Sequence, residues 1–115
     1  MLIGVVGPCA AGKSTLIASL KKYGYHAKHI AQEHSYVPDM WKRLTNPDIL
    51  IYLDVSYTLT LARRHMDWSQ TEYDVQIQRL HHAREYANFY LITDELTPEQ
   101  VLSEVLQFLE RSWDS

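Results

Sequence analysis

The sequence predicts a single α/β domain built on a small parallel sheet. Short apolar segments typical of strands alternate along the chain with longer amphipathic segments typical of helices, the order found in parallel-sheet proteins. Residues 2–6 and 49–55 are apolar at nearly every position, as in strands buried on both faces. No repeat, low-complexity tract or linker divides the 115 residues, so one domain of about four strands and five helices is expected.

The first half of the chain predicts two strands and two helices. Residues 2–6 are expected to form a strand, and residues 13–23 a helix with one apolar face. A weaker strand pattern follows over residues 26–31. A short helix over residues 40–44 must end before Pro47, because the residue preceding a proline is pushed out of helical geometry.

The second half begins with the clearest strand, over residues 49–55, which is rich in β-branched and aromatic side chains. Helices are expected over residues 57–66 and 70–87, and a last strand over residues 89–92. The final helix opens after Thr97, with a proline at its first position and a glutamine that completes a capping box.

The composition excludes several classes of protein. Apolar residues make up 46% of the chain and charged residues 22%, which is close to the averages for globular proteins and unlike disordered or coiled-coil chains. A net charge of −3 argues against a dedicated nucleic-acid binder. Residues 1–45 nevertheless carry six Lys or Arg against two Asp or Glu, a net +4, so an anionic ligand is expected there.

Neither membrane insertion nor secretion is expected. The longest clean apolar run, residues 49–53, is far shorter than the ~20 residues of a membrane-spanning helix. The first residues lack the basic start and long apolar stretch of a signal peptide. A lone Cys9 can form no internal disulfide, in agreement with a reducing compartment. We therefore expect a cytoplasmic protein.

The decisive motif is the run of residues 7–14, which matches the pattern G-x-x-x-x-G-K-[ST] in full. Its two glycines allow the backbone to bring N–H groups against phosphate oxygens, and the helix that follows adds its unpaired N-terminal donors. Lys13 is expected to reach the β- and γ-phosphates of a nucleotide, and the Ser14 hydroxyl to ligate Mg²⁺. The residues expected to bind the nucleotide are Gly7, Pro8, Cys9, Ala10, Ala11, Gly12, Lys13, Ser14 and Thr15.

With this motif the chain resembles the P-loop nucleoside and nucleotide kinase-like group, which includes the thymidylate-kinase-like and deoxynucleoside-kinase-like enzymes. The likeness covers residues 4–19, 47–64 and 89–109, and the last segment is similar to the final strand, adenine-side loop and final helix of small kinases. The resemblance implies a three-layer P-loop fold, with helices on both faces of the sheet, and ATP and Mg²⁺ as ligands. ATP is favoured over GTP because the guanine-selecting pattern [NT]-K-x-D is absent from the chain.

Four further residues are candidates for the chemistry. Asp54 ends an apolar strand, where an acid can hold Mg²⁺ directly or through water, although the resemblance implies a structural role for this position. By resemblance to deoxynucleoside kinases, Glu33 is the general base for the acceptor, with a solvated loop acid as the alternative. The same resemblance implies that Arg63 and Arg64 are lid arginines that clamp phosphates, with a charged helix face as the alternative. Adjacent residues point about 100° apart on a helix, so one of the two is expected to face the site.

No zinc site is expected, because His81 and His82 are adjacent rather than four apart and so do not form the helical metal pair. The small size of the chain allows a homodimer that completes a missing wall of the site, through apolar surface residues such as Tyr36, Trp41 and Tyr57.

The residues favour a small ATP-dependent phosphotransferase that acts on a small-molecule hydroxyl or phosphate. Its acceptor is expected among residues 33–43 and Trp68. Only some 17 residues, 32–48, stand where the family has an acceptor-binding region and a further strand. This shortness favours instead a nucleotide-binding module without chemistry of its own, and an ATPase that needs a partner protein is the third alternative.

Overall fold

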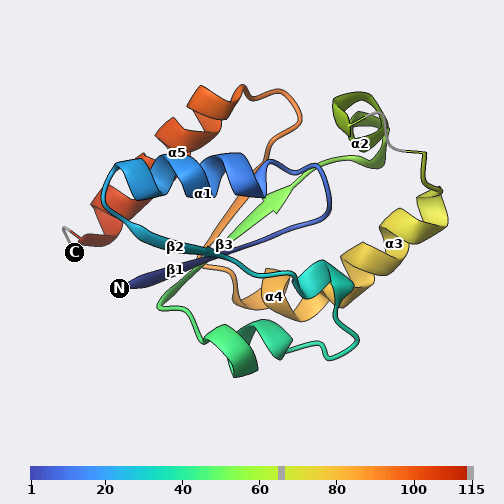
Figure 1. Cartoon of the computed structure of the whole chain (residues 1–115), viewed down its shortest axis with the longest axis horizontal. Coiled ribbons are helices and arrows are strands. Elements are labelled where there is room, and N and C mark those ends of the chain that lie inside the picture. Colours follow the sequence, from blue (N-terminus) through green and yellow to red (C-terminus); the bar gives the residue numbers. More distant parts are fainter. Residues whose placement is uncertain (65–66, 114–115) are drawn as a thin grey trace.

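The computed structural model describes residues 1–64 and 67–113, apart from the side chains of Arg64, Ser112 and Trp113. The described chain has a mixed α/β structure with a four-stranded, all-parallel sheet (Figure 1). The sheet order is β2-β1-β3-β4, with the bounds β1 (Leu2–Val6), β2 (His26–His29), β3 (Ile49–Asp54) and β4 (Phe89–Ile92). The predicted α/β class and parallel sheet are therefore confirmed.

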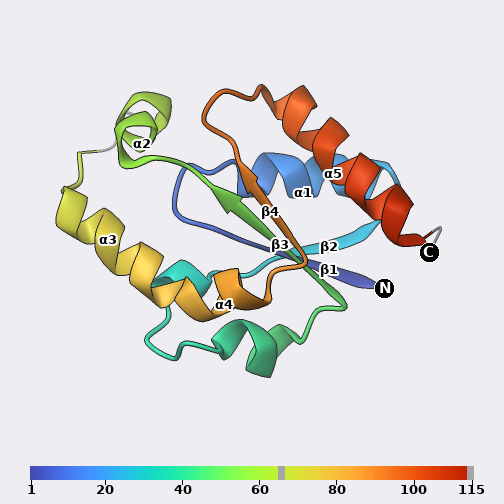
Figure 2. The same cartoon turned by 180° about the vertical axis from the view of Figure 1, so that it is seen from behind.

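Helices lie against both faces of this sheet. In Figures 1 and 2, α1 and α5 run over one face, and α4 and the turn η2 lie on the other. The α-helices are α1 (Lys13–Lys22), α2 (Tyr57–Arg64), α3 (Gln70–Arg79), α4 (His81–Tyr86) and α5 (Pro98–Trp113). Two short turns complete the described elements, the 3₁₀ turn η1 (Gln32–His34) and the π-helical turn η2 (Trp41–Thr45). The short helix expected over residues 40–44 is thus a single π-helical turn.

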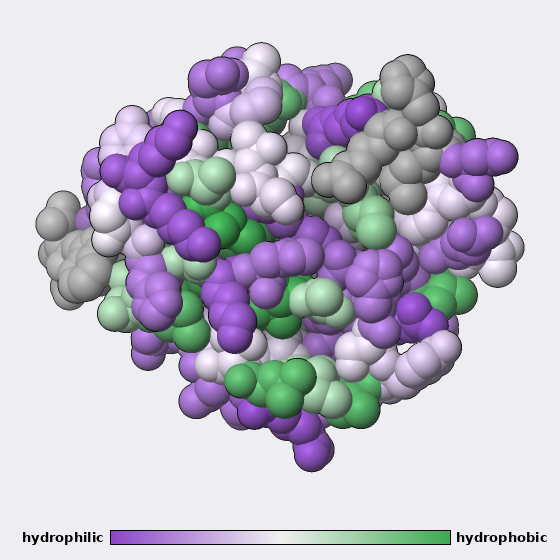
Figure 3. Space-filling model, in the orientation of Figure 1, coloured by the Kyte–Doolittle hydropathy of each residue, from purple (hydrophilic) through white to green (hydrophobic). Residues whose placement is uncertain are grey.

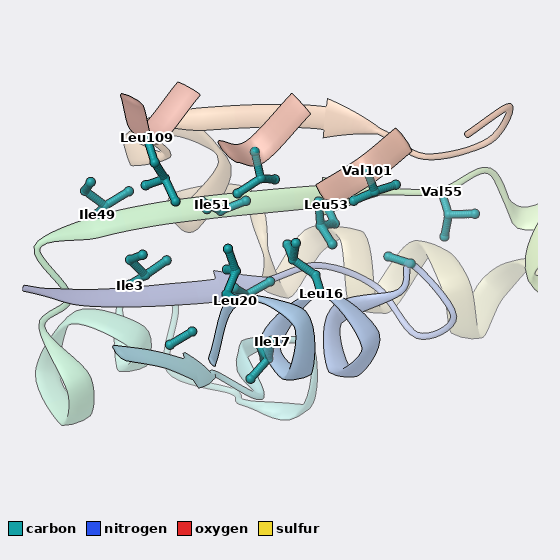
Figure 4. Packing of buried hydrophobic residues seen from close by; sticks show 14 residues of the cluster. Ile3, Leu16, Ile17, Leu20, Ile49, Ile51, Leu53, Val55, Val101 and Leu109 are labelled. Atoms are coloured by element: carbon teal, nitrogen blue, oxygen red, sulfur yellow. The ribbon is translucent and has the colours of Figure 1, made fainter. Parts of the chain in front are cut away.

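Strand β3 divides the core into two parts. Its residues Ile51 and Leu53 belong to a cluster with side chains of α1 and α5 (Figure 4). Leu50 and Tyr52, which alternate with them, belong to a second cluster that contains Trp41 of η2. All four β3 side chains are at most 2% exposed, so the strand is buried on both faces, as its apolar sequence predicts.

The helix expected over residues 70–87 is wrong as a single element, because it is interrupted at Leu80, between α3 and α4. The carbonyl oxygen of Arg79 accepts a hydrogen bond of 3.2 Å from Gln32 Nε2, which comes from η1. Leu80 itself is fully buried in the second cluster. A distant amide and the packing of one leucine therefore divide a segment whose local sequence favours continuous helix.

Of the three residues expected on a dimer surface, Trp41 is wrongly placed, because only 6% of it is exposed. Its indole Nε1 donates to His82 Nδ1 over 3.1 Å, which fixes η2 against α4. Tyr57 is half-buried, whereas Tyr36 is 88% exposed. The face drawn in Figure 3 carries small, separated apolar patches among hydrophilic side chains. No helix in the described part of the chain is both long and apolar enough to cross a membrane.

The order of the strands decides which segments meet. In a parallel sheet the carboxyl ends of all strands lie along one edge. The segment after β1 is residues 7–14, which we name the glycine-rich loop, and it lies between the end of β2 on one side and the ends of β3 and β4 on the other. Because β2 pairs directly with β1, Glu33 of η1 follows the strand next to this loop.

Candidate functional site

The glycine-rich loop adopts a backbone that requires small residues. A Cβ on Gly7 would lie 2.0 Å from the carbonyl oxygen of Leu53, so the loop passes too close to β3 for any side chain there. Ala10 has a φ of 69° and Gly12 a φ of 96°, both in the left-handed region. Residues of this conformation within a turn direct backbone N–H groups inward, which is the geometry of anion-binding loops.

Gln76 of α3 holds one side of the loop. Its Oε1 accepts from the Cys9 N–H over 3.0 Å, and its Nε2 donates to Cys9 Sγ over 3.2 Å. Within the loop, the Ala11 N–H donates to the Pro8 carbonyl over 3.3 Å. Gln76 is buried, so these contacts fix the loop against α3. Sequence reasoning did not single out Gln76, because 67 residues separate it from Cys9.

The side chain of Lys13 turns back toward the glycine-rich loop. It donates to the carbonyl oxygens of Gly7 and Pro8 and forms an ion pair with Glu33 Oε2. Lys13 is 7% exposed and Glu33 is 2% exposed, so the pair is removed from water. The structure thereby brings together two residues that the sequence nominates independently, one from the glycine-rich loop and one from the turn after β2.

The turn η1 brings Glu33 to the loop, and two histidines lie near its carboxylate, His34 from η1 and His29 from the end of β2. The Nε2 atoms of His29 and His34 lie 3.9 and 4.0 Å from Glu33 Oε2. Arg79 at the end of α3 donates to the backbone oxygen of Glu33 over 3.3 Å and so connects the turn to this helix. Burial lowers the pKa of His29 below its ordinary value, and the charge of Lys13 lowers it further, whereas Glu33 acts in the opposite direction.

A cavity of about 380 Å³ opens on the other side of the glycine-rich loop. One wall comes from the loop and the start of α1, and the other from α2, the segment between β4 and α5, and the first turn of α5. The lining residues are Ala10, Ala11, Gly12, Thr15, Leu16, Arg63, Thr93, Leu96, Pro98 and Val101. The volume falls in the range of small-molecule sites, and the lining is mostly apolar with a few polar groups, as in such sites.

Arg63 joins the two walls of this cavity. Its Nη1 donates to the Ala10 carbonyl over 3.2 Å and to Thr93 Oγ1 over 2.9 Å, and its Nη2 donates to the Thr93 carbonyl. Thr93 is 1% exposed and also donates to the Ala11 carbonyl over 3.2 Å. Of the two arginines expected at the site, Arg63 is thus at the cavity, while the side chain of Arg64 lies outside the described residues.

Asp54 lies at the end of β3 with both carboxylate oxygens in hydrogen bonds. Oδ1 accepts from the Val55 N–H over 2.9 Å, and Oδ2 accepts from the hydroxyl of Tyr90. Burial and this bond to Asp54 raise the pKa of Tyr90 to about 12. Ser14 and Thr15 at the start of α1 are exposed and accessible to a ligand. The Mg²⁺ roles of Ser14 and Asp54 stay predictions.

Sequence reasoning missed the residues that the fold brings to the site from far along the chain. Thr93 follows the last strand directly, and a position after a parallel strand is a signal that places a side chain at the sheet edge where ligands bind. Gln76 and Tyr90 carry no such signal, since each is one of several polar positions on its element.

A scan against protein-family models gives no match for this chain, and a search of curated proteins gives no relative.

Proposed function

We propose that this chain is a nucleotide-binding protein of the P-loop type, similar to small nucleoside and nucleotide kinases, with the three-layer P-loop fold. On this proposal it binds ATP with Mg²⁺ and transfers the γ-phosphoryl group to a small-molecule acceptor. The single observation that carries the proposal is the arrangement around the glycine-rich loop, with a cavity on one side and the Lys13–Glu33 pair on the other.

This arrangement matches the shape of ATP. The cavity of about 380 Å³ beside Arg63 and Leu96 would hold the base and sugar. The triphosphate would then run along the loop, where N–H groups and the N-terminus of α1 favour negative charge. Its terminal phosphate would reach Lys13, whose ammonium would exchange the carbonyl oxygens of Gly7 and Pro8 for phosphate oxygens.

The same exchange would release Glu33 for chemistry. Once Lys13 turns to the phosphates, the carboxylate of Glu33 would face the end of the triphosphate, where an acceptor hydroxyl enters. The acceptor oxygen forms a bond to the γ-phosphorus, and the bond between that phosphorus and the β–γ bridging oxygen breaks. The hydroxyl proton passes to Glu33, and ADP leaves.

The residues present are compatible with magnesium at this site. The exposed Ser14 hydroxyl is available as a ligand, whereas Asp54 would act through a water molecule, because both of its oxygens already accept protein hydrogen bonds. Held there, Mg²⁺ would supply positive charge that stabilises the phosphoryl group during transfer.

A second candidate function is a nucleotide-binding module without chemistry, whose bound state a partner protein recognises. The observation that favours it is the short segment between β2 and β3, which is occupied by the turns η1 and η2. Gln32 fixes this segment internally, since its side chain bonds to the Val37 carbonyl and the Trp41 N–H. A partner-dependent ATPase would require a further arginine from another chain.

The first experiment measures ATP·Mg²⁺ binding by isothermal titration calorimetry. Lys13→Ala should abolish binding, because the ammonium group is the only buried lysine charge in the described chain and faces the loop. Lys21→Ala, on the exposed side of the same helix, is the matched control and should bind like the unsubstituted chain. Equal affinity for Lys13→Ala and the control would refute the assignment of the loop.

The second experiment separates an enzyme from a binding module. Release of ADP is measured against a panel of nucleosides, nucleotides and sugars, with and without Glu33→Gln. A kinase should release ADP with at least one acceptor, and Glu33→Gln should remove that activity while it spares nucleotide binding. If a chain that binds ATP releases no ADP with any acceptor, the binding-module function replaces the kinase.

A further inference from the structure

Three different metal-ligand side chains meet beside the glycine-rich loop. Cys9 offers a sulfur, Glu33 a carboxylate oxygen and His34 a ring nitrogen, and these three atoms all lie within 4.8 Å of one another. Cys9 comes from the loop itself, and the other two come from η1. Glu33 is buried, whereas the His34 side chain is 60% exposed, so the cluster has a closed inner end and an end that is open to solvent.

A second and independent observation concerns the carboxylate. Oε2 of Glu33 is paired with Lys13, but Oε1 is buried and receives no hydrogen bond from the described part of the chain. Among the side-chain oxygens and nitrogens of residues 1–64 and 67–113, Glu33 Oε1 is the one buried atom without a hydrogen-bond partner. A carboxylate oxygen that has lost its water and gained no donor is unfavourable, and a bound cation is one of the groups that satisfies it.

We propose that Cys9, Glu33 and His34 bind a divalent transition-metal ion, and that zinc is the ion their chemistry fits. Thiolate, imidazole and carboxylate are the protein ligands of zinc, with bonds of about 2.0 to 2.3 Å that set tetrahedral ligand atoms about 3.5 Å apart. The cluster needs to close by roughly 1 Å to reach this spacing. His34 lies on the solvent side of a short turn, where such a movement meets little packing.

Three protein ligands leave one tetrahedral position open, as in zinc sites that bind a water or a substrate oxygen. This site goes beyond the proposed function, since zinc binding requires no nucleotide. A Glu33 carboxylate bound to zinc could not also accept the acceptor proton, so zinc binding and phosphoryl transfer would exclude each other. It also differs from the sequence-based expectation, which considered only the adjacent histidines of α4.

The charge of Lys13 links the metal to the state of the loop. Its ammonium contacts the same carboxylate, so it repels a dication bound there. Any ligand that draws Lys13 away should therefore strengthen zinc binding. Removal of the charge in Lys13→Met should raise zinc affinity by about tenfold or more, because a unit charge at this separation is poorly screened by the protein.

The test titrates the full chain with zinc in the absence of nucleotide, and calorimetry measures the affinity. The unsubstituted chain should bind one zinc ion, and Cys9→Ala and His34→Ala should each lower the affinity at least about tenfold. The control is His81→Ala, which removes an exposed histidine whose Nε2 lies 2.9 Å from Glu85. Circular dichroism verifies that each variant is folded. Unchanged affinity in Cys9→Ala, or a loss confined to His81→Ala, would overturn the proposal.

Cobalt provides a spectroscopic measurement of the same site. Co²⁺ in the site should give the absorption of a cobalt–thiolate bond, and Cys9→Ala should lack it. Absence of that absorption in the unsubstituted chain would also overturn the proposal. The two proposals fail separately, since a chain that binds zinc but not ATP refutes only the nucleotide site, and a chain that binds ATP but not zinc refutes only the metal site.

Discussion

Lys13 and Glu33 form a buried ion pair that joins the start of α1 to the turn after β2. Both side chains are less than a tenth exposed, so neither charge has water as an alternative partner. The pair therefore couples the conformation of the glycine-rich loop to the position of η1. It also means that a ligand of the loop must compete with a carboxylate for the same ammonium group.

The first prediction concerns the free energy of unfolding. Lys13→Met and Glu33→Gln should each lower it by about 3–5 kcal/mol, because each leaves one buried group of the pair without its partner. The double variant should lose much less than the sum of the two, since neither charge then remains. Urea denaturation of the four chains measures the coupling. Additive losses would contradict an energetic link between these residues.

The second prediction compares two glycines of the same loop. Gly7→Ala should destabilise the chain strongly and abolish ATP binding, because the new Cβ would lie 2.0 Å from the Leu53 carbonyl. Gly12→Ala meets no atom within 4 Å and has only the cost of its φ of 96°, about 1–2 kcal/mol. Thermal unfolding and calorimetry compare the two variants. A Gly7→Ala chain as stable as Gly12→Ala would show that the loop can move away from β3.

The third prediction concerns the wall of the cavity. Arg63→Lys keeps the positive charge but loses the planar fork that bonds Ala10 and Thr93 together. Nucleotide affinity should fall by roughly tenfold, which corresponds to the loss of about one charge-assisted hydrogen bond. Arg111→Lys, on the exposed last turn of α5, is the control and should bind normally. Calorimetry with ATP·Mg²⁺ measures the affinity of each variant. Equal affinities for Arg63→Lys and Arg111→Lys would show that Arg63 does not contribute to nucleotide binding.

The fourth prediction is a pH dependence of stability. The folded chain keeps the proton of Tyr90 up to its raised pKa of about 12, whereas the unfolded chain releases it at the ordinary tyrosine pKa of about 10. The unfolded state then binds fewer protons, so this group makes the free energy of unfolding fall as pH rises through that window. Tyr90→Phe should show a shallower fall in urea denaturation.

The control for that experiment is Tyr86→Phe, which removes a phenol that is 60% exposed. It should follow the slope of the unsubstituted chain, so that effects common to all high-pH titrations cancel in the comparison. An equal slope for Tyr90→Phe and the control would contradict a raised pKa of Tyr90 from burial and its bond to Asp54.

The strands could be predicted because their signal is local. β1 and β4 have the bounds that the apolar runs predict, and β3 ends one residue before the expected residue 55. The second strand was expected over residues 26–31 and ends at His29, although Ile30 still donates to the Val5 carbonyl over 3.0 Å. The interruption at Leu80 could not be predicted, because the amide of Gln32 that causes it is 47 residues from Arg79.

The candidate site divides in the same way. The glycine-rich loop follows from a contiguous motif. Glu33 is chosen because deoxynucleoside kinases, which the sequence resembles, have a glutamate at the corresponding place after the second strand. The ion pair of Glu33 with Lys13 of the loop depends on β2 being the direct neighbour of β1, which no local pattern reveals. The same is true of the contact between Cys9, Glu33 and His34, where residues of ordinary appearance become a candidate metal site only through the fold.

The strand order has a consequence for how the chain folds during synthesis. β1 and β2 pair first along the chain, β3 then adds to the free side of β1, and β4 adds to β3. No later strand has to enter between two that are already paired. The sheet can thus grow outward as the ribosome releases each segment, with the glycine-rich loop and Glu33 brought together before β3 is made.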